Sequence, residues 1–177
     1  MSRRQPSDTD KVMLRVDDTS KLVSDISNNL TNMYMSDLDN QMQNIRNQLN
    51  SNSLISDDSL ETMILDLANS LYFACSAQED LGIKEDTCKA IRQEVFNKAR
   101  EQATGTVADR DMAGTLASQQ ESIVLSIYSR AYKRVKLKVD AGYEMLNSLK
   151  KIMNKRIAEM ELSQSRYIGG QPDERTR

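Results

Sequence analysis

The segment IYSRAYKRVKLKVDAGYEMLNSLKKIMNKRIAEM, residues 127–160, decides the fold class of this chain. Its apolar residues recur every three or four positions, which is the repeat of a helix with one buried side. The segment has no proline, and only Gly142 weakens the helical pattern. It predicts a long C-terminal helix whose buried side consists of Ala131, Tyr132, Val135, Val139, Gly142, Leu146, Leu149, Met153, Ile157 and Met160.

Proline is also absent on both sides of this segment, from about residue 109 to about residue 162. An unbroken helix of about fifty residues would be about 75 Å long, more than a monomer of this size can cover. Such a helix usually packs against a copy of itself or against a partner, so we expect a helical oligomer. The alternative is a break near Gly114 or Gly142.

Composition favours an all-α protein built from helical hairpins. Of the 177 residues only 5% are aromatic, and 6 Gly with 2 Pro are too few for a turn-rich β protein. No run reaches the roughly 18 apolar residues of a membrane span, and the first ten residues lack the apolar core of a signal peptide. We expect a cytoplasmic protein with no membrane segment.

The pattern divides the chain into four parts. Residues 1–17 are polar and are expected to be flexible. Residues 18–56 predict an acidic amphipathic helix with a narrow apolar seam formed by Val23, Ile26, Leu30, Met33, Leu38, Met42, Ile45 and Leu49. Residues 57–162 predict a helical core that includes the basic C-terminal helix, and residues 163–177 a flexible tail.

Capping residues and glycines mark the expected helix ends. Asp18 and Thr19 are suitable N-caps for the first helix, and Asp58 with Glu61 is suitable for a capping box at the second. The later boundaries are, in chain order, a stop at Gly82, a cap at Asp86, a left-handed stop at Gly105 and a cap at Asp109 or Asp111.

No catalytic or metal-binding constellation is present in the sequence. The chain has no His, which is the commonest general base and metal ligand, and it has no phosphate-binding glycine motif. Cys75 and Cys88 are thirteen positions apart, without the spacing of a zinc site, and are predicted to be reduced thiols in the core. We expect no catalytic residue, no metal, no cofactor and no enzymatic activity.

Charge is distributed unevenly along the chain. Residues 1–90 carry 8 Lys/Arg against 15 Asp/Glu, whereas residues 91–160 carry 13 against 8. An acidic front and a basic rear indicate either an anionic partner for the rear or self-association between regions of opposite charge.

On a helical wheel the cations of the C-terminal helix gather opposite its apolar side. Members of this stripe are Arg130, Lys133, Arg134, Lys151 and Lys155. One interpretation is a solvated helix face, and the other, more specific interpretation is a surface that binds successive phosphates. Residues 128–156 favour the second, because they hold nine Lys/Arg against Asp140 and Glu144. Nearby tyrosines could stack on bases, but two of the three lie on or beside the apolar side, which favours core packing: Tyr128, Tyr132 and Tyr143.

Lys98 and Arg100 permit the same two interpretations. As cations in the last turn before Gly105 they favour the negative end of the helix dipole, by about 0.3 to 1 kcal/mol. As neighbours of a glycine loop they could instead hold a phosphate beside backbone N–H groups.

In the order of these features the chain resembles the UvsY family of bacteriophage recombination mediators. The resemblance covers about residues 60–170 and rests on ANSLY at residues 68–72, on Lys98-Ala99-Arg100, and on the long final helical region. Within that region it involves Tyr143, Leu146, Leu149 and the run from Arg156 to Met160.

The resemblance implies an all-helical, ring-like homo-oligomer that binds single-stranded DNA. Such a protein helps to load a RecA-class recombinase onto DNA covered by single-strand-binding protein, in the host cytoplasm if the chain is phage-encoded. Lys98 and Arg100 correspond to the family's DNA-contact motif, which we expect to be aided by Arg92, Arg130, Lys133 and Arg134. The C-terminal helix corresponds to the oligomerisation element, with subunit contacts expected at Leu146, Leu149, Met153 and Ile157.

Two departures from the family pattern keep a second hypothesis open. Glu101-Gln102-Ala103 follows Arg100 where the family often has aromatic residues, and the family offers no role for the acidic helix at residues 18–51. The alternative is a helical phage structural or assembly protein, such as a virion component or a scaffolding-type chaperone, whose basic stripe meets an acidic protein surface.

Overall fold

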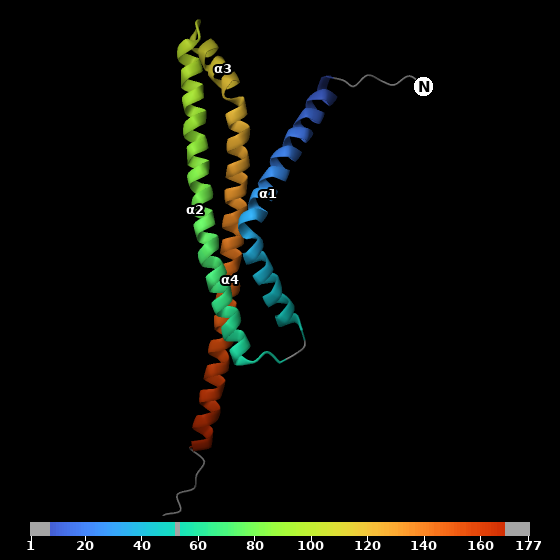
Figure 1. Ribbon diagram of the computed structural model, residues 1–177, viewed down its shortest axis with the longest axis vertical. Coiled ribbons are helices and arrows are strands. Elements are labelled where there is room, and N and C mark those ends of the chain that lie inside the picture. The colour runs from blue at the N-terminus through green and yellow to red at the C-terminus, as the bar shows by residue number, and fades with distance from the viewer. Residues whose placement is uncertain (1–7, 52–53, 169–177) are drawn as a thin grey trace, which may run out of the picture. The chain divides into compact units, whose positions relative to one another are not determined.

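The computed structural model describes residues 8–51 and 54–168, and every regular element in these ranges is an α-helix (Figure 1). In chain order the helices are α1 (Asp8–Asn50), α2 (Asp57–Gln102), α3 (Val107–Ala117) and α4 (Gln119–Ile168). The all-α prediction is therefore confirmed. None of the described helices combines the length and the apolarity that crossing a membrane requires.

The helices build two compact units, and the long helices contribute to both. One unit comprises the chain up to Ser36 together with Ala74–Lys138, and the other comprises Asp37–Phe73 together with the chain from Val139 onward. We call them the first and the second unit. This division differs from the expected parts at residues 18–56 and 57–162, because α1, α2 and α4 each pass from one unit into the other.

The core of the first unit contains fewer residues of the predicted α1 seam than expected. Its buried apolar residues are Val23, Met35, Ala74, Leu81, Ile127, Ala131 and Val135. Ile26 and Met33, which belong to that seam, are exposed, whereas Ser27 and Thr31 are buried. Ser27 Oγ lies 2.6 Å from Val23 O and 3.2 Å from Ile127 O, and Thr31 Oγ1 donates to Ser27 O at 2.7 Å. These small side chains are satisfied by carbonyls, so they can face the core at low cost.

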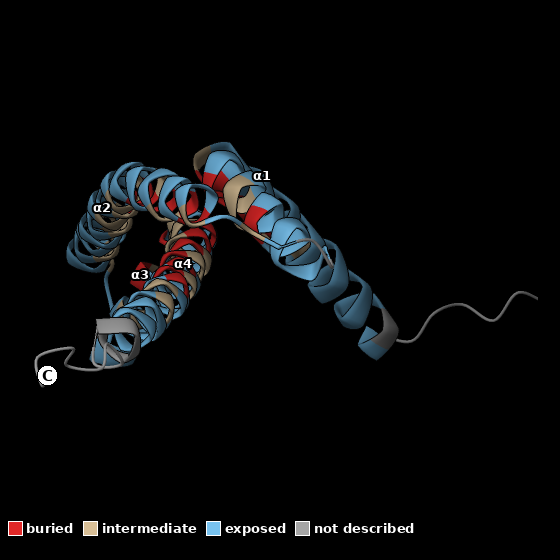
Figure 2. Cartoon of the chain, turned by 90° about the horizontal axis from the view of Figure 1, so that it is seen from below, coloured by how far each residue is buried: buried red, intermediate tan, exposed pale blue. Residues whose placement is uncertain are grey.

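The second unit has an aliphatic core built from segments of three helices. Its members are Leu38, Ile45, Leu60, Met63, Leu67, Leu71, Val139, Leu146 and Leu149. A Cβ on Gly142 would lie 2.7 Å from Leu71 Cδ2, so this glycine lets α4 approach α2 closely. The helix continues through Gly142, and the break considered there does not occur. In Figure 2 the buried positions lie along one side of the helices.

The first helix begins earlier than predicted. It starts at Asp8, so residues 8–17, expected to be flexible, are helical, and residues 1–7 lie outside the described part. Lys11 Nζ donates to Asp8 Oδ1 at 2.9 Å in the first turn. Thr19, proposed as a cap with Asp18, instead lies inside the helix and donates to Arg15 O at 2.8 Å.

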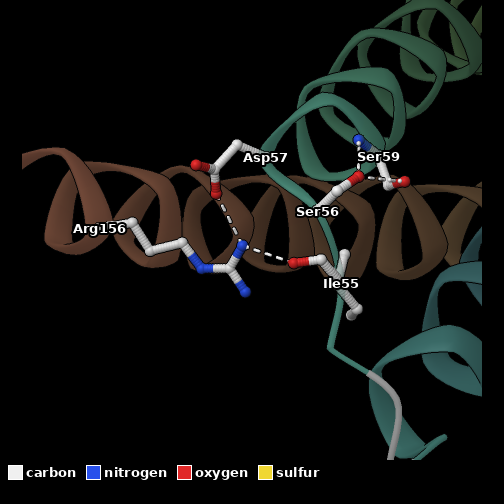
Figure 3. A network of polar contacts seen from close by, with 5 residues as sticks. All are labelled: Ile55, Ser56, Asp57, Ser59 and Arg156. Carbon is white, nitrogen blue, oxygen red and sulfur yellow. Dashed lines mark hydrogen bonds and ion pairs between the residues drawn. The ribbon is translucent and has the colours of Figure 1, made fainter. Parts of the chain in front are cut away.

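The N-terminus of α2 is capped by Ser56 rather than by Asp58 (Figure 3). The Ser59 N–H donates to Ser56 Oγ at 3.2 Å, and the two hydroxyls are 2.8 Å apart. Arg156 Nη1, from α4, donates to Ile55 O and to Asp57 Oδ1, both at 2.8 Å. The cap predicted at Asp58 is therefore wrong by two positions: Ser56 is the cap, and the Arg156 guanidinium of the same unit binds the residues on either side of it.

The second helix runs through Gly82, where a stop was predicted. A Cβ on Gly82 would meet the Tyr132 ring at 3.5 Å, so the residue packs against α4 within the first unit. Asp86, the expected cap of a separate helix, accepts from Lys89 at 3.0 Å inside α2. Nearby, Lys84 Nζ donates to Tyr34 Oη at 2.7 Å, and this contact raises the pKa of Lys84.

The stop at Gly105 is confirmed, and a capping box follows it. Helix α2 ends at Gln102, and Gly105 has φ 118°, a left-handed conformation that favours glycine. Thr106 caps α3 by accepting from Asp109 N, while Asp109 Oδ2 accepts from Thr106 N at 2.9 Å. Asp109 is thus the third residue of α3, which closes the box, rather than the cap itself.

A break separates α3 from α4 close to the position considered at Gly114. The first of these helices ends at Ala117, Ser118 is its C-cap, and α4 begins at Gln119. A Cβ on Gly114 would lie 2.8 Å from the Phe96 ring and 2.9 Å from Phe96 O, so α3 rests directly on the α2 backbone. The last helix extends to Ile168, so residues 163–168 of the predicted flexible tail are helical.

Candidate nucleic-acid interface

A run of cations occupies α4 within the first unit. No acidic residue occurs between Ser122 and Val139, and five Lys/Arg lie in this interval: Arg130, Lys133, Arg134, Lys136 and Lys138. We call these five residues the basic segment. The core side of the same helix carries Ala131 and Val135, both fully buried. The amphipathic repeat therefore directs much of the basic segment toward solvent, with Arg130, Lys133 and Lys136 exposed.

Several charges of the basic segment have no neutralising carboxylate. In the described part of the chain, Arg130, Lys133 and Lys136 take part in none of the ion pairs that the structure contains. Arg134 Nη1 donates to Asn28 Oδ1, which belongs to a neutral amide and leaves the positive charge uncompensated. A cluster of uncompensated cations creates a local positive potential that attracts an anionic partner.

A pocket of about 270 Å³ lies next to Arg130 in the first unit. It is lined by Thr19, Ser20, Val23, Ser122, Ile123, Ser126 and Arg130. No carboxylate belongs to this lining, and Arg92 Nε donates to Ser122 Oγ at 2.8 Å. Of the predicted contact residues, Arg130 therefore lines this hydroxyl-rich pocket, and Arg92 contacts one of its lining residues, Ser122.

The tripeptide at residues 98–100 divides into two roles. Arg100 Nε lies 2.7 Å from Asp111 Oδ1, with both side chains about half exposed, so this arginine ties the end of α2 to α3. Lys98 is exposed and, within the described residues, has no ion pair. Arg100 therefore has a structural partner, and Lys98 is the cation of this pair that remains available to a ligand.

The two tyrosines of α4 within the first unit present little ring surface for stacking beside the basic segment. Tyr132 is half-buried with its ring against Gly82, and Tyr128 is also half-buried. These two agree with the expectation of core packing, whereas Tyr143, in the second unit, is 45% exposed. The chemistry offered at this surface is thus that of cations and hydroxyls.

The four residues expected to form subunit contacts all lie in the second unit but differ in accessibility. Leu146 and Leu149 are 6% and 0% exposed, because they pack in the core of their own unit. Met153 is half-buried and Ile157 is 42% exposed. Only the last turns of this apolar side are open, so the first two leucines cannot contact a second chain without disturbing their own core.

Some members of the interface were not predicted. Lys136 and Lys138 belong to the basic segment but were left out, although the lack of acidic residues between Ser122 and Val139 is visible in the sequence. Asn28 and Asp111 could not be found in this way, because they meet Arg134 and Arg100 only after the helices pack.

The comparisons with family models, with curated proteins and with solved structures each found no match. The described residues include no group of three or more Cys, Asp or Glu placed to hold a metal ion. Cys75 and Cys88 form no disulfide bond, and both are half-buried.

Proposed function

We propose that this protein is a non-enzymatic single-stranded DNA-binding protein that contacts the DNA backbone through the basic segment of α4. The observation that carries this proposal is the set of uncompensated cations at Arg130, Lys133 and Lys136 in an interval without acidic residues. Several cations along one helix face can neutralise successive phosphates and gain affinity by releasing counterions.

The pocket beside Arg130 supports contact with phosphate rather than with bases. Hydroxyls and guanidinium groups are common phosphate ligands, and this lining has no carboxylate that would repel an anion. Since Tyr128 and Tyr132 are half-buried, base stacking contributes little. The binding we propose is therefore largely independent of base sequence, and Lys98 adds a phosphate contact near the end of α2.

A role as a recombination mediator rests on the resemblance to the UvsY family. In this role the protein holds single-stranded DNA while a RecA-class recombinase replaces single-strand-binding protein. A homo-oligomer would strengthen such binding, because linked sites act at a high effective concentration. The alternative stays a helical structural or assembly protein whose basic segment meets an acidic protein surface.

A binding titration with fluorescent oligo(dT) tests the proposal. The protein should raise the fluorescence anisotropy of the oligonucleotide at low salt, and Lys133→Ala with Lys136→Ala should weaken the binding. The matched control is Lys89→Ala, because Lys89 is an exposed cation of the same unit that already pairs with Glu85 and Asp86. Equal loss in both variants, or no binding at low salt, would contradict the proposal and favour the assembly protein.

A further inference from the structure

The outward side of α2 in the second unit carries exposed aromatic and acidic side chains. Leu65, Tyr72 and Phe73 are 62%, 69% and 63% exposed, and the two rings meet edge to face with centroids 5.5 Å apart. Glu61, Leu65 and Tyr72 are four and seven positions apart, so they share one side of the helix, with Asp58 one turn before them. We call Asp58, Glu61, Leu65, Tyr72 and Phe73 the acidic–aromatic face.

Aromatic side chains at this level of exposure are characteristic of contact surfaces. Tyrosine and phenylalanine supply large apolar area with little rotamer entropy to lose, which is why aromatic residues are enriched in interfaces. The core of this unit is filled from the other side of α2, by Leu60, Met63 and Leu67. The core of the second unit is therefore filled without the side chains of the acidic–aromatic face.

The charge around this face specifies a cationic partner. Residues 54–83 contain no Lys or Arg at all. In the described part of the chain Arg156 pairs with Asp57, but neither Asp58 nor Glu61 takes part in an ion pair. A partner that covers the rings must come with positive charge to avoid leaving these carboxylates facing an apolar or acidic surface.

The same unit carries a surface of complementary chemistry on α4. Lys151, Lys155 and Leu162 are exposed and are also four and seven positions apart, and Ile152 beside them is 37% exposed. Among the described residues Lys155 has an ion pair only with Glu159, at 3.8 Å between two exposed side chains, which is a weak pair. We call Lys151, Ile152, Lys155 and Leu162 the basic–apolar face.

We propose that the acidic–aromatic face of one copy binds the basic–apolar face of a second copy. The spacings of four and seven residues coincide, so a parallel alignment places Glu61 beside Lys151, Leu65 beside the stem of Lys155, and Tyr72 beside Leu162 of the other chain. The two surfaces differ, and α2 and α4 of the second unit run in opposite directions (Figure 1), so a parallel contact either closes a dimer through two such contacts or extends into a filament. It is independent of the DNA contact proposed above, which lies in the first unit.

Charge-reversal substitutions on each surface test this arrangement. The measurement is the mass of the protein in solution, determined by light scattering without nucleic acid. Glu61→Lys alone, and Lys151→Glu with Lys155→Glu, should each raise the concentration needed for association by at least about tenfold. An equimolar mixture of the two variants should associate again, because each basic surface then meets an acidic one. Glu94→Lys, an exposed reversal on α2 in the first unit, is the control and should change nothing.

Substitution of the two aromatic rings provides a second test. Tyr72→Ser with Phe73→Ser should weaken association while circular dichroism keeps the wild-type helix content, because both rings are exposed in the single chain. A wild-type protein that is monomeric at all concentrations would overturn the proposal. Association that survives both charge reversals, or a mixture that stays dissociated, would also overturn it.

Discussion

Lys98 and Arg100 lie two positions apart in α2, but only Arg100 lies beside a carboxylate, that of Asp111. Two substitutions that look equivalent in the sequence should therefore have different results. Arg100→Ala should lower the free energy of unfolding by about 0.2 to 1 kcal/mol, the usual range for an exposed ion pair. Lys98→Ala should leave the stability unchanged, because Arg100 and not Lys98 is the cation in the last turn of α2, and it should weaken binding of single-stranded DNA. Urea denaturation and oligonucleotide anisotropy on both variants measure this difference, and identical profiles would contradict it.

Asp109 gives the capping box of α3 a defined pH dependence. Its hydrogen bonds from the Thr106 hydroxyl and backbone N–H lower the pKa of Asp109 below the usual 3.8. The ionised carboxylate is the form that the folded state prefers. The stabilisation is therefore fully present above the unfolded pKa and is lost as pH falls through the lower folded pKa.

Asp109→Asn should accordingly destabilise the protein at pH 7, and the difference between the two proteins should shrink from pH 7 to pH 2 as the carboxylate is protonated. Thermal melts of both proteins across this range measure the effect. A difference between the two proteins that is as large at pH 2 as at pH 7 would show that the carboxylate charge is not the cause.

At the scale of helices, the sequence predicts the elements better than their ends. The long C-terminal helix and the stop at Gly105 follow from periodicity and glycine chemistry, which are local. The stop predicted at Gly82 fails because that glycine packs against Tyr132, a residue fifty positions away. The seam at Ile26 and Met33 fails because buried serine and threonine hydroxyls can bond to carbonyls of their own helix.

The same reasoning limits what could be said of the candidate interface. The cations of α4 are visible in the sequence because acidic residues are missing around them. The pairing of Arg100 with Asp111 and the pocket shared by Ser20 and Ser126 depend on packing between helices, which no local pattern encodes.

Two glycines provide a matched test of the contact between α3 and α2. Gly114→Ala should destabilise by about 1 to 3 kcal/mol, because its Cβ would lie 2.9 Å from the Phe96 carbonyl oxygen. Gly82→Ala meets only the Tyr132 ring, at 3.5 Å, and should stabilise by up to about 1 kcal/mol through helix propensity. Chemical denaturation measures both changes, and a destabilisation of equal size at the two positions would refute the assigned close contact.

At the scale of the whole chain, opposite charges are assigned to different surfaces. The basic segment belongs to α4 in the first unit, and the acidic–aromatic face belongs to α2 in the second. Substitutions should therefore alter the proposed DNA binding and the proposed self-association separately. A net charge of only −2 hides this separation, which the uneven distribution along the sequence already indicates.

The central claim, that the basic segment neutralises DNA phosphates, is tested most directly by the salt dependence of the affinity for oligo(dT). Each phosphate contact contributes a slope of about −0.7 to log K against log[salt] for a single strand. Lys133→Ala with Lys136→Ala should therefore make the slope shallower by about 1.4, while Lys89→Ala keeps the wild-type slope. A wild-type affinity that does not fall with salt, or a double variant with an unchanged slope, would contradict the account.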